Sequence, residues 1–118
     1  MNFIAHPLTG DLLNKYDDDA VKRSIRQLVS LGSFEKPFHP EIAGSVRELL
    51  FEPIGRNTAI GIESRIEFLI KQFESRADLI SIEVDPNITE DGYDITIRFR
   101  VINQLEPVVQ RIFLQRVR

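Results

Sequence analysis

The periodicity of apolar residues changes near Leu79, and this change limits the folds open to the chain. Before it, apolar side chains recur every three or four residues, as on one face of a helix. After it, the runs 80–85 and 93–101 alternate apolar with polar residues, and the turn-forming segment 86–92 separates them. The sequence therefore predicts helices followed by an antiparallel hairpin, an α+β fold in a single domain of 118 residues.

Three helical patterns precede the hairpin. The first begins near residues 17–19, three aspartates of the kind that favour a helix N-terminus, and ends at Gly32. The second covers residues 45–51 and ends before Pro53. We expect Asn57 or Thr58 to cap the third, whose buried stripe comprises Ile62, Ile66, Leu69, Ile70 and Phe73. Helices packed on one face of a small antiparallel sheet would make up the domain, residues 17–118, after an irregular N-terminal arm, residues 1–16.

The last strand-like segment, residues 108–117, is apolar on both faces. The predicted helices can cover one face of the sheet, so the other face, or a free strand edge, is expected to await another protein. The alternative is that Phe113 and Val117 pack under the N-terminal arm. Residues 93–118 also carry five arginines against two acidic residues, which indicates either a solvated strand face or a surface that contacts a partner.

The composition argues against several classes of function. No apolar run has the length of a membrane span, and the start of the chain lacks the pattern of a signal peptide. The chain is acidic overall and has no basic cluster with aromatic residues for nucleic acid. There is no cysteine, and His6 and His39 stand beside prolines without the spacing of a metal site or catalytic triad. We therefore predict no catalytic residue, cofactor or metal, although a carboxylate pair could in principle hydrolyse glycosides.

Short boxes of residues follow one another in a definite order through the middle of the chain. Residues 37–41 read Pro-Phe-His-Pro-Glu, residues 50–52 read Leu-Phe-Glu after Gly44, and residues 74–76 read Glu-Ser-Arg between a long helix and the hairpin. This order resembles the baseplate wedge or sheath-initiator family of contractile phage tails, which is similar to the TssE component of type VI secretion. The matching box residues are Pro37, Phe38, Pro40, Glu41, Gly44, Leu50, Phe51 and Glu52.

The resemblance implies that the loop after the third helix docks the protein on the core bundle of the baseplate wedge. The family loop reads Glu-Pro-Arg, whereas this chain has Ser75 between Glu74 and Arg76, so both charged residues remain and the stiffening proline does not. An arginine can make a bidentate contact with a carboxylate of a partner. The alternative is that Glu74 and Arg76 pair with each other or cap the helix.

The resemblance also implies that the C-terminal strands exchange strands with the tail sheath protein and so template its assembly. The residues expected to face the sheath are Arg98, Arg100, Arg111, Phe113 and Arg116. Expected partners are the sheath protein and the wedge core bundle, with the tail tube as a further candidate, in six-fold repetition within the virion baseplate after assembly in the host cytoplasm. Nucleic acid and membrane are not expected partners. The competing function is a small lysozyme-like hydrolase of peptidoglycan, a label that this family sometimes carries, with Glu35, Glu41 and Glu52 as candidate carboxylates.

Overall fold

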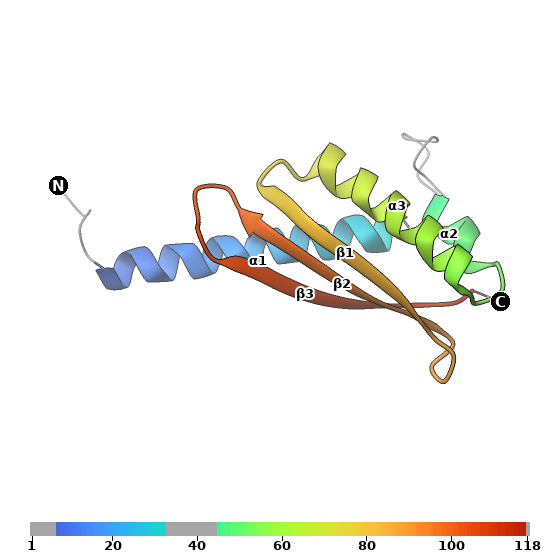
Figure 1. Ribbon diagram of the computed structural model, residues 1–118. Helices are drawn as coiled ribbons and strands as arrows, with labels where there is room; N and C mark the ends of the chain where they lie inside the picture. Colours follow the sequence, from blue (N-terminus) through green and yellow to red (C-terminus); the bar gives the residue numbers. More distant parts are fainter. Residues whose placement is uncertain (1–6, 33–44, 118) are drawn as a thin grey trace.

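The computed structural model describes residues 7–32 and 45–117, and these form one layer of helices against one face of a three-stranded antiparallel sheet (Figure 1). The helices are α1 (Pro7–Gly32), α2 (Ser45–Leu50) and α3 (Arg56–Phe73). The strands are β1 (Ala77–Asn87), β2 (Gly92–Val101) and β3 (Pro107–Gln115), in the order β1-β2-β3. The predicted α+β fold is confirmed.

Helix α1 begins earlier than the sequence pattern suggested. We expected an irregular arm up to residue 16, but the helix already starts at Pro7, so the three aspartates at 17–19 lie inside it. Proline suits the first turn of a helix because its φ is fixed near the helical value and its missing N–H is not needed there. Gly10 and Asn14 broke the apolar period without breaking the helix, since each costs only about 1 kcal/mol or less in helix propensity. The division of the chain at residue 17 stays a prediction.

Helix α3 begins at a different cap from the one predicted. Gly55, in an extended conformation, occupies the N-cap position, and the Thr58 hydroxyl donates to the Pro53 carbonyl oxygen at 3.3 Å instead of capping the helix. The apolar stripe is nevertheless as expected, because Ile62, Ile66 and Ile70 are fully buried. Only Phe73, at the end of the stripe, remains 41% exposed.

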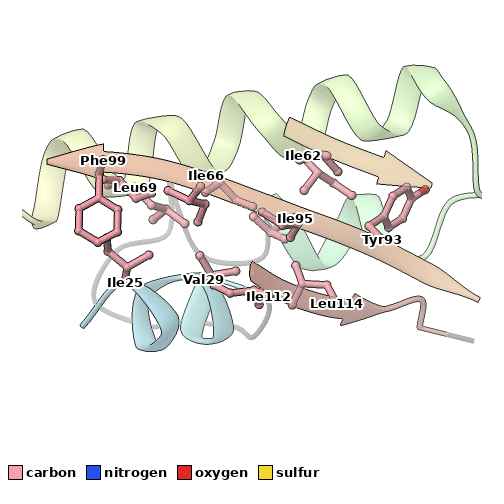
Figure 2. Close-up of a cluster of buried hydrophobic side chains, with 14 of the residues drawn as sticks. Ile25, Val29, Ile62, Ile66, Leu69, Tyr93, Ile95, Phe99, Ile112 and Leu114 are labelled. Atoms are coloured by element: carbon pink, nitrogen blue, oxygen red, sulfur yellow. The ribbon is translucent and has the colours of Figure 1, made fainter. Parts of the chain in front are cut away.

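The core lies between the helices and the sheet (Figure 2). Side chains of α1 and α3 point at a continuous apolar face formed by alternate residues of the strands. The buried residues include Val21, Ile25, Val29, Ile62, Ile66, Leu69, Tyr93, Ile95, Ile97, Phe99, Val108, Ile112 and Leu114. One inward side chain of β3 is polar: Gln110 Nε2 donates to the Lys22 carbonyl oxygen at 2.9 Å and so ties β3 to α1.

Each sheet strand alternates between the core and the open face, as the period-2 pattern predicted. In β3 every second residue, from Val108 to Leu114, is buried, and the residues between them are exposed. No helix lies over the outer face in Figure 1, so the structure leaves this face uncovered by the described residues. The prediction of a strand with apolar residues on both sides is confirmed, because Val109 and Phe113 are 39% and 41% exposed there.

Candidate functional site

The first candidate site is the loop between α3 and β1. Glu74 is the C-cap residue of α3, and its backbone N–H donates to the Ile70 carbonyl oxygen at 2.9 Å. Its side chain is only 4% exposed and accepts two hydrogen bonds from the Arg76 guanidinium, Nε to Oε2 at 2.9 Å and Nη2 to Oε1 at 3.1 Å. The Arg76 backbone N–H donates to Oε2 as well, at 3.1 Å. The loop is therefore closed on itself by a bidentate ion pair.

A third element completes this arrangement. Ser24, on α1, donates its hydroxyl to Glu74 Oε1, so the buried carboxylate joins α1, the end of α3 and the start of β1. Nothing in the sequence indicated Ser24, which is 50 positions away from Glu74. Burial alone would raise the pKa of Glu74, but the hydrogen bonds from Arg76 and Ser24 outweigh it and hold the pKa below its ordinary value. Glu74 is thus ionised at neutral pH.

Arg76 differs from its partner in exposure. Its side chain is 54% exposed, and its pKa is raised because it donates to Glu74 and lies in the field of that carboxylate. These two contacts use one Nε and one Nη2 donor of a group that has five, so the guanidinium still has donors to offer. Of the two interpretations left open by the sequence, internal pairing is present. It holds the arginine in place without covering it.

An open hollow of about 390 Å³ lies next to this loop. Residues 75, 77 and 78 line one side, and residues 100–104, at the end of β2 and the following turn, line the other. The two segments are joined by the Ile102 N–H, which donates to the Arg76 carbonyl oxygen at 2.9 Å. Ile102 and Leu105 in that turn are 52% and 90% exposed, so apolar surface adjoins the charged loop.

The second candidate site is the outer face of the sheet. Arg98 pairs with Val109, Thr96 with Arg111, and Asp94 with Phe113, and residues paired in this way have side chains on the same face. Arg100 lies one pair further along and donates from Nε to the Leu105 carbonyl oxygen at 3.2 Å. The structure thus brings together four of the five residues that were expected to face a sheath.

Arg116, the fifth, lies elsewhere. It follows the end of β3, where its Nε donates to the Glu52 carbonyl oxygen at 3.1 Å and its backbone N–H to the Asp91 carbonyl oxygen at 2.8 Å. The next residue, Val117, donates its N–H to the Leu50 carbonyl oxygen at 2.9 Å and is partly buried against the core. These contacts attach the C-terminal segment to the end of α2 and to the turn before β2. Arg116 therefore does not join the other four residues on the outer face of the sheet.

Phe113 covers the backbone of β2 on the outer face. A Cβ placed on Gly92 would collide with the Phe113 ring and with the Leu114 carbonyl oxygen, so the ring lies directly over the glycine. An aromatic side chain that covers a strand glycine protects the exposed backbone there. The ring is held in position while 41% of the residue remains open to solvent.

The arginines of the outer face are not neutralised within the described part of the chain. Among residues 7–32 and 45–117, Arg98 and Arg111 have no ion pair, although both stand on a face that also carries Asp94. The acidic residues of the sheet are concentrated on β1, which has Asp78, Glu83 and Asp85 and no basic residue. The face is therefore acidic towards β1 and basic towards β3.

The Leu-Phe-Glu box has a structural role in this fold. Leu50 is buried, Phe51 is 48% exposed beneath the Arg47 guanidinium at 5.2 Å from the ring centre, and Glu52 is exposed. The backbone carbonyl oxygens of Leu50 and Glu52 accept hydrogen bonds from the C-terminal residues Val117 and Arg116. The other box residues, Pro37, Phe38, Pro40, Glu41 and Gly44, lie outside the described residues.

The described residues offer little for catalysis. In the two described ranges, no three His, Cys, Asp or Glu side chains come together as metal ligands. Among the described residues the buried carboxylate is Glu74. Its pKa is lowered by its arginine partner, whereas the acid of a glycosidase needs a raised pKa. None of the described helices has an apolar stretch long enough to cross a bilayer.

Comparison with known proteins finds similarity both in sequence and in structure. No protein-family model matches the chain. The baseplate wedge protein gp25 of Enterobacteria phage T4 is 28% identical over 91 residues, which cover 77% of this chain and 69% of that protein. The crystal structure at 1.44 Å of a Geobacter sulfurreducens protein, provisionally named a tail lysozyme, superposes with a TM-score of 0.59 at 20% identity, over 84% of this chain and 92% of that one. At this identity the second likeness shows a shared fold.

Proposed function

We propose that this chain, which is a distant homologue of the baseplate wedge protein gp25 family, docks on the core of a contractile-tail baseplate and gives the sheath its starting geometry. The role is structural, and each of the two candidate surfaces makes one of the attachments that it requires. The loop at Glu74–Arg76 is the attachment to the wedge core bundle, and the sheet of residues 77–115 is the attachment to the first sheath ring. The chain would repeat six-fold around the tail axis and reside in the virion.

The observation that carries the docking role is the fixed but exposed Arg76. A side chain loses conformational freedom when it binds, and a guanidinium already held by Glu74 has lost much of it beforehand. The charged loop also adjoins the exposed Ile102 and Leu105, so a partner could combine an apolar contact with a polar one. Arginines next to apolar surface are common at protein–protein interfaces.

The sheath role is supported by the uncovered face and edge of the sheet. A strand added to a sheet edge gains backbone hydrogen bonds of about 1 kcal/mol each, so four or five of them give a modest attachment. Six-fold repetition would strengthen it through effective concentration. A catalytic group is not needed for this task, and hydrolysis of peptidoglycan has no support from the geometry of Glu52 or Glu74.

The docking role can be tested with Arg76→Ala in the full chain, co-expressed with the baseplate and sheath genes of its own genome. The matched control is Lys71→Ala, which removes the exposed Lys71–Glu67 pair on α3 while Arg76 stays in place. We expect both variants to give the circular dichroism spectrum of the unsubstituted chain, and only Arg76→Ala to be missing from baseplates in negative-stain images and in immunoblots of sedimented particles. Normal incorporation of folded Arg76→Ala would refute the docking role.

A further inference from the structure

Helix α1 helps to hold the charged loop between α3 and β1. The Ser24 hydroxyl donates to Glu74 Oε1, the same oxygen that accepts from Arg76 Nη2. The other carboxylate oxygen, Oε2, accepts from Nε and from the backbone N–H of Arg76. Among these contacts of the Glu74 carboxylate, the one from Ser24 comes from outside the loop. Ser24 therefore fixes the Glu74–Arg76 pair relative to the helical layer.

A second residue of α1, Asp17, lies on the same side of the helix as Ser24. The two are seven residues apart, which is close to two helical turns, or about 10 Å along the axis. Asp17 is exposed and makes no ion pair with the residues of the two described ranges. Its charge still acts on Arg76, because it adds to the hydrogen bonds and the charge of Glu74 that raise the pKa of Arg76. An exposed carboxylate of α1 thus lies near the exposed guanidinium.

The surface around Arg76 consequently carries both signs of charge. The Arg76 side chain is 54% exposed, and its unused donors can bind a carboxylate of a partner. An approaching segment that carried acidic residues alone would be repelled by Asp17, since like charges across an interface disfavour association. A segment that places a carboxylate at Arg76 and a lysine or arginine at Asp17 is attracted at both positions. Such complementarity selects the partner and fixes its orientation.

From these features we infer that α1 forms the second half of the docking site. Ser24 is a positioning residue that holds Arg76 through Glu74, and Asp17 binds a basic side chain of the same partner segment whose carboxylate binds Arg76. The inference rests on the proposed function for the docking role of Arg76. It adds a second element to the docking surface and specifies the charge pattern of the partner.

The positioning role is tested in the full-length chain labelled with ¹⁵N. The variants are Ser24→Ala, the conservative Ser24→Thr and, as a control, Ser30→Ala, which removes the hydroxyl of another partly buried serine of α1. The measurement is the exchange of the Arg76 Nε proton with water, which is slowed when the guanidinium is held. We expect Ser24→Ala to speed this exchange about five-fold, and Ser24→Thr and Ser30→Ala to leave it unchanged. Equal exchange in Ser24→Ala and the unsubstituted chain would overturn the positioning role.

The role of Asp17 is tested by competition for places in the baseplate. Unsubstituted and variant full-length chains with different tags are produced in equal amounts together with the baseplate and sheath genes of the same genome. The variants are Asp17→Lys and the matched Asp19→Lys, an equal charge reversal at an exposed position about 160° around α1. We expect sedimented baseplates to contain about five- to ten-fold less Asp17→Lys than unsubstituted chain, and equal amounts of Asp19→Lys and unsubstituted chain.

Arg76→Ala in the same competition separates this inference from the proposed function. If Arg76→Ala is excluded while Asp17→Lys and Asp19→Lys enter equally well, the inference is overturned and the docking role stands. If Arg76→Ala enters normally, the docking role is refuted and the inference with it. Should circular dichroism show that Ser24→Ala is unfolded, the comparison of Asp17→Lys with Asp19→Lys still decides whether α1 belongs to the docking site.

Discussion

At the scale of single residues, Glu74 shows how one buried carboxylate can serve both stability and binding. It accepts from Ser24 on α1 and from Arg76 at the start of β1, and it ends α3. The contacts that hold the fold together here are the same ones that hold Arg76 in an exposed position. The sequence indicated both charged residues, but it could not reveal Ser24, because that contact depends on how α1 is laid across the sheet.

The charge of Glu74 should give stability a specific pH dependence. Its pKa is lower in the folded chain than the ordinary value of 4.5, so its contribution is present above that value and is lost as the pH falls through the folded pKa. We expect Glu74→Gln to lower the free energy of unfolding by about 1–3 kcal/mol at pH 7. The difference between the two proteins should shrink at pH 3, as measured by urea denaturation. A difference that stays constant between pH 7 and pH 3 would show that the carboxylate is not stabilised by its partners.

Substitution of Gly92 should lower the stability of the fold. Gly92→Ala would drive a Cβ into the Phe113 ring and the Leu114 carbonyl oxygen, and overpacking of this kind costs about 1–3 kcal/mol. Gly55→Ala is the control, because nothing lies within 4 Å of the added Cβ and the backbone there is extended. The urea midpoint should fall clearly for Gly92→Ala, whereas Gly55→Ala should lower the free energy of unfolding by less than about 1 kcal/mol and leave the midpoint nearly unchanged. Equal midpoints would mean that Phe113 moves aside freely.

At the scale of elements, the features that depend on local sequence pattern were predicted correctly, and the features that depend on packing were not. The hairpin and the stripe of α3 follow from periods of 2 and 3.6, and both are present. The start of α1 was wrong because Gly10 and Asn14 hid a helix that tolerates them. The cap of α3 was wrong because Thr58 bonds to Pro53 across the preceding turn. The register shift in β1, which distinguishes the two edges, leaves no local signal.

Helix α1 offers a test of the domain boundary. In Figure 1 its first turns project beyond the sheet, while Val21, Ile25 and Val29 are fully buried in the core. A chain of residues 17–118 would start its helix with three aspartates, which favour a helix N-terminus. We expect it to keep a cooperative thermal transition in circular dichroism and to lose at most about 1 kcal/mol of stability. Loss of the transition would place residues 7–16 within the folding unit.

At the scale of the whole molecule, the three described helices all lie on one side of the sheet. The radius of gyration is 16.3 Å, compared with about 13 Å for a compact domain of 100 residues, and the shortest extent is 19 Å. Residues 7–32 and 45–117 form one helical layer and one sheet layer, so within these residues one face of the sheet is uncovered and its two outer strands have no further partner strand. The charge on that face is unevenly distributed, because β1 carries the acidic residues Asp78, Glu83 and Asp85 whereas β3 carries Arg111.

The central claim is that the sheet of residues 77–115 takes part in strand addition with the first sheath ring, and a cryo-electron microscopy reconstruction of the assembled baseplate with that ring would test it most directly. We predict a sheath segment paired with an edge strand of this sheet, and Arg76 at the contact with the wedge core. A reconstruction in which neither edge of the sheet has a paired sheath strand and the outer face makes no contact with sheath subunits would contradict this claim.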